Sequence, residues 1–307
     1  MNGSGLNAIY TLFILMGLGV FLKKRGILNK SVESTMTRLI SAYLVPAMMV
    51  YNVKNQFTKT FLIDNLTALA AVFVLISASV VLSLIVARIF RIEERREGIF
   101  AVMFSFSNSM FIGFPVVSGI FGDPGIPYLM LFYLINTTLF WTLGVYLVGK
   151  GGDHKLLSPS SLKKIFNPGF WGFMVGLVLL FLDIPVHPSV MKSLEYLSGM
   201  VTPLASIYMG SVAADIRLKD MLYIKDMLLV ILGRFIVSPF LCLFICRLLG
   251  FPQLLTQVFV VISALPVMTN VSIVAGSYGK DSRFTAFMTA LTTLLCIFAL
   301  PFYFRFI

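Results

Sequence analysis

The residues best suited to bind a small ligand are uncharged polar and helix-breaking residues in the middle of two long apolar stretches. In the first stretch, SFSNSMFIGFPVVSGIFGDPG (Ser105–Gly125), the candidates are Asn108, Ser109, Gly113 and Pro115. In the second, ALPVMTNVSIVAGS, they are Pro266, Thr269 and Asn270. Proline removes a helical hydrogen bond and clashes with the preceding turn, whereas Asn, Ser and Thr favour helix N-caps. Each stretch therefore predicts two half-helices separated by a break.

Half-helices that begin inside an apolar stretch can bind anions. Their first N–H groups have no helical partner, and each N-terminus carries roughly half a positive elementary charge. A bare backbone at membrane depth is tolerated only where it lines a cavity, and a small anion fits such a place. The alternative is a proline that only bends its helix while Asn and Ser bond to neighbouring helices. We favour breaks in these two stretches, and bends at Pro46 and Pro203 in two other apolar stretches.

Further polar residues lie near the middle of other apolar stretches. Arg234 is an ionisable residue at such a position, where a charge costs ~2.5–3.5 kcal/mol unless it finds a partner. It either neutralises a substrate carboxylate or bonds to backbone carbonyls freed by a broken helix. Two polar clusters supply either a cavity wall or hydrogen bonds between helices: Asn136, Thr137 and Thr138 in one stretch, and Thr289, Thr292 and Thr293 in another. No Asp or Glu is central in any apolar stretch, which disfavours a buried carboxylate relay and suits an anionic substrate.

Composition places all these residues in a membrane. The 307 residues are 58% hydrophobic and only 12% charged, with a mean hydropathy of +0.94, which one soluble core cannot hide. The net charge of +11 comes from short clusters between apolar runs, without the aromatic-interleaved basic face of a nucleic-acid-binding protein. We therefore expect an all-α protein in a lipid bilayer, with no nucleic-acid partner.

Counting apolar runs of spanning length predicts ten transmembrane helices. They are Leu6–Leu22, Val32–Val53, Ile63–Phe90, Glu97–Ile120, Ile126–Gly149, Gly169–Ile184, Val190–Ala213, Met221–Leu249, Gln253–Ser277 and Ser282–Phe306. Alternate connections hold 17 Lys and Arg on one side against 5 on the other, counting the tail. Because cytoplasmic loops retain positive charge, both termini are expected outside and the loop 150–168 in the cytoplasm.

The ten predicted helices divide into an inverted repeat. Five helices in 1–149 and five in 169–307, joined by the loop 150–168, would have opposite orientations. A shift of 157 residues superposes helix-breaking residues of the two halves, such as Pro46 on Pro203 and Gly119 on Gly276. This recurrence is typical of inverted-repeat transporters whose fourth and ninth helices are broken.

Several motifs coincide with one known family. The runs LVPAMMVY, SNSMFIGFPVV, NPGFWGFMVGL, TPLASIYMGS and ALPVMTNVSIVAGSYG resemble the bacterial branch of the auxin efflux carrier family, which includes proteins described as malate permeases. The resemblance implies a fold like that of the bile acid:sodium symporters, with a scaffold of helices 1, 2, 6 and 7 and a transport core of helices 3–5 and 8–10. It also implies that helices 4 and 9 cross, that Asn108 lies beside the substrate, and that scaffold helices form a homodimer.

The functional expectation is a secondary transporter of the inner (cytoplasmic) membrane. It would move a small organic anion, a mono- or dicarboxylate, by alternating access, with a proton or sodium as a possible coupling ion and no cofactor or metal. The alternatives are a sodium-coupled symporter of bile-acid-type anions and an anion channel. An intramembrane enzyme is disfavoured, because His154 and His187 lie in loops and no H-E-x-x-H motif occurs.

Overall fold

The computed structural model describes residues 3–149, 168–215 and 223–306. Within these ranges the chain is helical, and its one β-bridge joins Ser107 to Val267. The expected cytoplasmic loop lies outside the described residues, apart from Pro168, which begins a helix.

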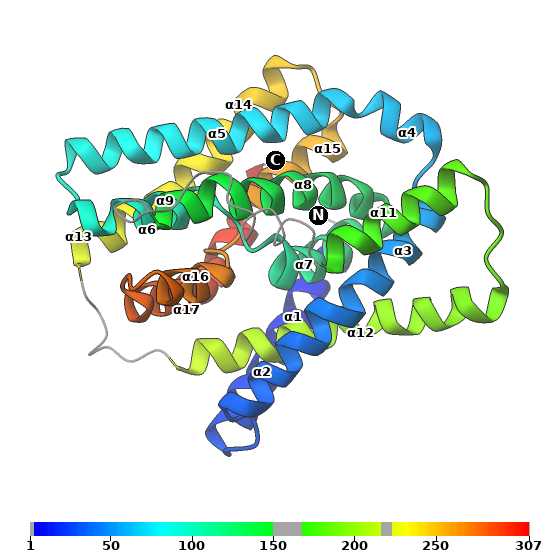
Figure 1. Ribbon diagram of the computed structural model, residues 1–307, viewed down its shortest axis with the longest axis horizontal. Helices are drawn as coiled ribbons and strands as arrows, with labels where there is room; N and C mark the ends of the chain where they lie inside the picture. Colours follow the sequence, from blue (N-terminus) through cyan, green and yellow to red (C-terminus); the bar gives the residue numbers. More distant parts are fainter. Residues whose placement is uncertain (1–2, 150–167, 216–222, 307) are drawn as a thin grey trace.

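The first half of the chain forms helices of very different lengths (Figure 1). They are α1 (Gly3–Lys24), α2 (Lys30–Leu39), α3 (Val45–Gln56), α4 (Lys59–Asp64), α5 (Leu66–Ile89), α6 (Glu94–Ser105), α7 (Phe114–Phe121), α8 (Ile126–Leu139) and α9 (Val145–Gly149). Short wider or tighter turns connect some of them: the π-turns η1 (Ile40–Leu44), η2 (Ser109–Gly113) and η4 (Phe140–Gly144), and the 3₁₀ turn η3 (Asp123–Gly125).

The second half is built in a similar way. It contains α11 (Pro168–Phe181), α12 (Pro188–Ala214), α13 (Ile224–Leu232), the π-turn η6 (Gly233–Val237), α14 (Ser238–Leu248), α15 (Gln253–Ser263), α16 (Asn270–Ser277) and α17 (Ser282–Phe306).

Four continuous helical stretches of the described chain are long and apolar enough to cross a membrane. They are Leu66–Ile89, Asp123–Gly149, Pro188–Ala214 and Ile224–Leu248. Shorter apolar helices cover Ser109–Phe121, Pro168–Phe181 and Gln253–Ser263. These lengths show an all-helical membrane protein, while the ten-span inverted repeat stays a prediction.

Two sets of helices pack closely. In one, α1 lies against α12, and α3 lies against α11 and α12; in the other, α5 contacts α6, α8 and α14. Glycines allow α1 and α12 to approach one another, since a Cβ on Gly19 would lie 2.0 Å from the carbonyl oxygen of Ile207. A Cβ on Gly210 would likewise lie 1.9 Å from the carbonyl oxygen of Met16. Helix α7 contacts α1 and α12 of the first set and α8 of the second, and so joins the two sets.

Prolines bend helices without interrupting them at several places. The π-turns η1, η2 and η6 end one residue before the dipeptides Val45-Pro46, Phe114-Pro115 and Ser238-Pro239. A π-turn widens the helix by one residue, which relieves the clash between a proline ring and the preceding turn. Residues Lys30–Gln56 therefore follow one bent helical path, and α12 continues through Pro203. Neither stretch breaks at its proline, which agrees with the prediction that Pro46 and Pro203 do not form half-helices.

The two apolar stretches that hold the ligand-binding candidates differ from the proline bends, because their helices are interrupted. Helix α6 ends at Ser105, and the next helical turn begins at Ser109. Helix α15 ends at Ser263, and α16 begins at Asn270. The sequence-based prediction of half-helices is thus confirmed in both stretches.

Candidate functional site

The two helix breaks cross and bond to each other through their backbones. The N–H of Asn108 donates to the carbonyl oxygen of Pro266 at 2.9 Å, and the N–H of Met268 donates to that of Phe106 at 3.3 Å. Ser107 and Val267 lie between these two bonds as an antiparallel bridge. A pair of extended segments therefore satisfies backbone groups that the broken helices leave without partners.

Side chains from the neighbouring helices hold this crossing in place. Asn136, on α8, donates to the carbonyl oxygen of Ser107 at 3.0 Å and accepts from its N–H at 3.4 Å. On the other strand, the N–H of Val267 donates to the hydroxyl of Thr292, on α17, at 3.1 Å. Each central residue of the crossing thus has a polar partner on the helix that follows its own half-helix in the chain.

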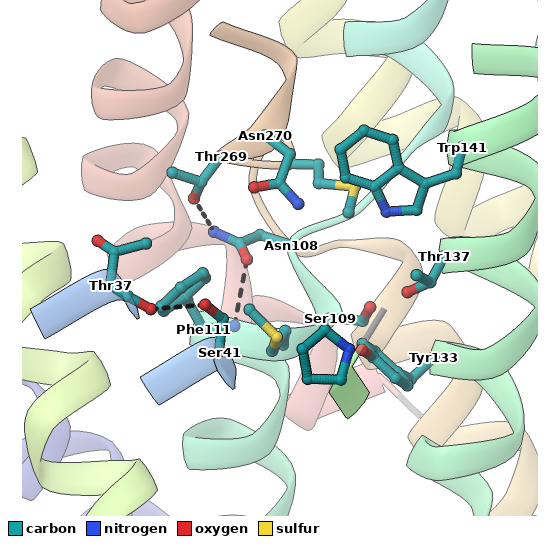
Figure 2. A pocket seen from close by; sticks show the side chains of 13 residues that line it. Thr37, Ser41, Asn108, Ser109, Phe111, Tyr133, Thr137, Trp141, Thr269 and Asn270 are labelled. Atoms are coloured by element: carbon teal, nitrogen blue, oxygen red, sulfur yellow. Dashed lines mark hydrogen bonds between the residues drawn. The ribbon is translucent and has the colours of Figure 1, made fainter. Parts of the chain in front are cut away.

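Asn108 joins the two half-helices through its side chain. Its Oδ1 accepts from the N–H of Phe111 at 3.2 Å, which is the N-cap that the sequence predicts. Its Nδ2 donates to the hydroxyl of Thr269, immediately before α16, at 2.8 Å (Figure 2). The amide therefore fixes the start of one half-helix relative to the start of the other.

Arg234 lies at the C-terminal ends of α6 and α15, the helices that precede the two breaks. Its side chain is 1% exposed, and all its hydrogen bonds go to backbone carbonyls. The guanidinium donates to Phe104 at 3.2 Å, to Ser263 at 2.7 Å and to Leu265 at 2.9 and 3.1 Å. These contacts agree with the second interpretation of Arg234, in which the arginine bonds to backbone carbonyls freed by broken helices.

A cavity of about 200 Å³ opens beside the crossing, at the starts of η2 and α16. The described residues that line it all have uncharged side chains: Thr37, Ser41, Asn108, Ser109, Met110, Phe111, Tyr133, Thr137, Trp141, Pro168, Met268, Thr269 and Asn270. Figure 2 shows Asn108 between Thr269 and Phe111, with Asn270 and Trp141 beside them. The cavity therefore combines two helix N-termini with an amphipathic wall.

Only some of the residues proposed from the sequence line this cavity. Asn108, Ser109, Thr269 and Asn270 do. Gly113, Pro115, Pro266, Asn136 and Arg234 do not. Asn136, Pro266 and Arg234 instead hold the crossing, and Pro115 lines a separate apolar cavity of about 30 Å³ next to Met209 and Cys296.

Several lining residues were not among the sequence candidates, notably Thr37, Ser41, Tyr133 and Trp141. Thr137 is also notable, because its buried hydroxyl makes no hydrogen bond of normal geometry, although the Tyr133 hydroxyl is close enough to interact with it. Buried polar atoms usually have partners, so an unpaired hydroxyl on a cavity wall is a group that a ligand or water can satisfy.

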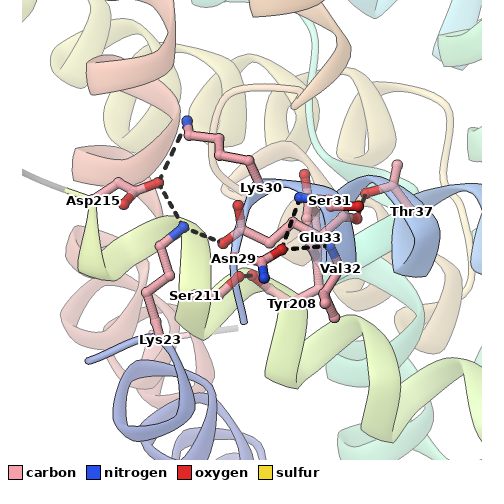
Figure 3. A network of polar contacts seen from close by, with 10 residues as sticks. All are labelled: Lys23, Asn29, Lys30, Ser31, Val32, Glu33, Thr37, Tyr208, Ser211 and Asp215. Atoms are coloured by element: carbon pink, nitrogen blue, oxygen red, sulfur yellow. Dashed lines mark hydrogen bonds and ion pairs between the residues drawn. The ribbon is translucent and has the colours of Figure 1, made fainter. Parts of the chain in front are cut away.

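A second, charged cavity of about 460 Å³ shares Thr269 with the first. Its lining includes Lys30, Glu33, Asp215 and Arg283. Beside it, Lys23 on α1 bonds to Glu33 on α2 at 2.5 Å and to Asp215, just after α12, at 3.2 Å (Figure 3). This network joins the ends of three helices. Among the described residues, no group of three or more His, Cys, Asp or Glu side chains could hold a metal ion.

Comparison with known proteins identifies the family of this chain. A family model described as "membrane transport protein" matches residues 4–304. The chain belongs to this family, the auxin efflux carriers. The carrier is 25% identical over 303 residues to an uncharacterized transporter of Methanothermobacter thermautotrophicus, covering 95% of both chains. It is 24% identical over 302 residues to an uncharacterized transporter of Methanocaldococcus jannaschii, covering 95% of this chain and 96% of the relative. The protein is thus a membrane transporter, and the motif resemblance is confirmed at the level of the family.

Proposed function

We propose that this transporter carries a small organic anion, bound in the cavity of about 200 Å³ beside the crossing. The observation that carries the proposal is the meeting of two half-helix N-termini at an uncharged, amphipathic cavity. Helix N-termini present unpaired N–H groups and partial positive charge, which suit a carboxylate. The methionine and aromatic side chains of the same wall suit an apolar body attached to that carboxylate.

The position of the cavities supports transport by alternating access. The two cavities that share Thr269 are lined by residues near the ends of helices that the charge distribution predicts to be cytoplasmic, including Pro168 in one and Lys30 in the other. Toward the predicted outer side, the cavity lined by Pro115 and Leu300 is only about 30 Å³. This difference is what an inward-facing state of a carrier in the cytoplasmic membrane would have.

The wider architecture remains part of the proposal. Five helices followed by five inverted helices would place both termini outside, and the matching partners of Ser107 and Val267 support that symmetry. In the same scheme α1, α2–α3, α11 and α12 are the scaffold, which would also form a homodimer, and the remaining helices are the moving core. A proton or sodium ion is the proposed coupling ion.

A binding screen followed by transport in vesicles tests the proposed function. Purified protein is heated with mono- and dicarboxylates, with and without sodium, because a ligand of the folded state raises the apparent melting temperature. The best ligand is then loaded into proteoliposomes for exchange of labelled substrate. We expect saturable exchange that Asn108→Ala abolishes. Flux that rises without saturation would indicate a channel instead, and strict dependence on sodium with bile-acid-type anions would favour the symporter alternative.

A further inference from the structure

The crossing brings together helix ends of both signs. The N-terminal ends of η2–α7 and of α16 meet there, and so do the C-terminal ends of α6 and α15. Each end carries roughly half an elementary charge, positive at an N-terminus and negative at a C-terminus. Without another charge, the two signs nearly cancel, and an anion in the cavity gains little.

Arg234 donates all its hydrogen bonds at the negative ends. Phe104 is in the last turn of α6, Ser263 is the last residue of α15, and Leu265 follows two residues later. Carbonyls in these positions have no partner within their own helix. The guanidinium therefore satisfies the orphan acceptors and places a full positive charge where the two negative helix ends meet.

The positive charge of Arg234 is not offset by any acidic side chain in the part of the chain that the structure describes. No Asp or Glu among the described residues forms an ion pair with it. Its charge of +1 offsets the roughly −1 of the two C-terminal ends, so roughly +1 remains at the two N-terminal ends. That remainder matches one negative charge in the cavity.

We infer that Arg234 determines the charge selectivity of the binding cavity without touching the substrate. It is a positioning and charge-balancing residue, because it acts through the ends of the broken helices and lines neither cavity beside the crossing. The inference rests on the proposed function, since it explains why the transported species is an anion. It assigns the selectivity to a charge on the far side of the crossing from the ligand.

The electrostatic potential of the cavity can be measured without knowing the substrate. In protein whose three native cysteines are replaced by alanine, Ser41→Cys places one thiol on the cavity wall. Its reaction rates with negatively charged sulfonatoethyl methanethiosulfonate and positively charged trimethylammonioethyl methanethiosulfonate give a ratio that reports the local potential. Ser31→Cys, exposed at the start of α2, is the reference thiol in the same background.

Two substitutions at Arg234 test the role of its charge. Arg234→Gln should lower the anion-to-cation rate ratio at the cavity thiol by about tenfold or more, because one charge at helix-end distances is weakly screened in a buried site. Arg234→Lys should keep the ratio within about threefold of the original, since the charge is retained. Neither substitution should change the ratio at Ser31→Cys. An unchanged ratio in folded Arg234→Gln protein would overturn the inference and leave Arg234 a purely structural residue.

A second pair of variants keeps the guanidinium in place, in case loss of Arg234 prevents folding. A negative charge at the position of Cys296 would interact with the charge of Arg234. Cys296→Asp should therefore offset the charge of Arg234, and Cys296→Asn is the uncharged control of the same shape. We expect the Asp variant to lower the ratio at the cavity thiol and the Asn variant to leave it unchanged. Equal ratios in the two would contradict the inference, and because no transport is measured, a failure of the proposed function would not affect this result.

Discussion

Asn108 and Pro266 are joined across the two helix breaks by a backbone hydrogen bond of 2.9 Å between the Asn108 N–H and the Pro266 carbonyl oxygen. Any residue except proline could supply that N–H, so the bond alone does not require asparagine. The side-chain contacts do require an amide, because the Asn108 amide accepts from Phe111 and donates to Thr269 at the same time. Only Asn or Gln offers both a carbonyl and an NH₂ group in this way.

Replacing Asn108 should therefore affect binding more than folding. Asn108→Ala keeps the backbone bond but loses the cap, which is worth about 1 kcal/mol of stability. Asn108→Asp keeps the cap, yet it cannot donate to Thr269 and brings a negative charge to the proposed anion site. We expect both variants to fold, and affinity for the best organic anion to fall at least about tenfold in each, a difference of ~1.4 kcal/mol. Affinity and melting temperature are measured on the same samples. Near wild-type affinity in either variant would remove Asn108 from the site.

Two neighbouring threonines of α17 provide a matched test of the crossing. Both are buried, but only Thr292 accepts from the N–H of Val267, whereas Thr293 donates to Thr289 within its own helix. Thr292→Val leaves a buried N–H without a partner, which costs about 1–3 kcal/mol. Thr293→Val should change stability by clearly less. The melting temperatures of the two variants measure this difference. Equal losses would show that the hydrogen bond from Val267 to Thr292 does not contribute to stability.

The net charge at the cavity predicts a preference among carboxylates. Among the described residues no charged side chain lines it, and the helix ends balanced by Arg234 leave roughly one positive charge, so a singly charged anion is matched and a second carboxylate is not. We expect monocarboxylates with an apolar body to compete for binding better than dicarboxylates of similar size. Competition at a pH where both acid groups are ionised measures this preference. Stronger competition by the dicarboxylates would indicate a cationic contact that the described lining of the cavity lacks.

The ion network in Figure 3 predicts unequal effects of its members. Lys23 bonds to both Glu33 and Asp215, and its side chain and that of Glu33 are 15% and 11% exposed. Lys23→Met leaves two carboxylates without their shared partner, whereas Glu33→Gln leaves Lys23 paired with Asp215. The lysine variant should therefore be the less stable of the two in thermal unfolding. Because breaking a partly buried pair costs more than losing an exposed one, the contrasting control is Lys192→Met, whose pair with Glu195 is exposed.

The charge asymmetry of the loops predicts which face is cytoplasmic. Ser31 and Ser189 are exposed at the first turns of α2 and α12, which the asymmetry places on opposite sides of the membrane. In intact cells, single cysteines at these positions should react with a membrane-impermeant reagent only at 189. Labelling only at 31 would invert the orientation, and labelling at both would contradict the inverted repeat.

Residue type alone predicts the two helix breaks and their cap. A proline next to Asn, Ser or Thr inside an apolar run leaves few other local structures, so the breaks near Asn108 and Pro266 could be found by reading along the chain. The role of Arg234 could not be decided this way. Its partners are backbone carbonyls, which every residue has, and the sequence does not show which of them a broken helix exposes.

The rest of the cavity wall is equally hard to read from sequence. In a soluble helix the buried face differs in polarity from the exposed face, but lipid is as apolar as a protein core. Tyr133 and Trp141 therefore look like any aromatic residues of a membrane helix, although both face the cavity. The π-turns before Pro46, Pro115 and Pro239 also rotate the following residues, which shifts any face extrapolated with a regular helical period.

The bond between Asn108 and Pro266 also has a consequence for how the protein is made. Its two partners are 158 residues apart in the chain, so the amino-terminal helices enter the membrane well before their partner is synthesised. During that interval the backbone groups around Ser107 lie at membrane depth without the crossing that later satisfies them, a state that hydrocarbon strongly penalises. The nascent chain must therefore shelter this break, either as a temporarily continuous helix or in contact with the insertion machinery. Ribosome-bound chains halted before and after Val267 should then differ in how accessible Ser107 is to the lipid.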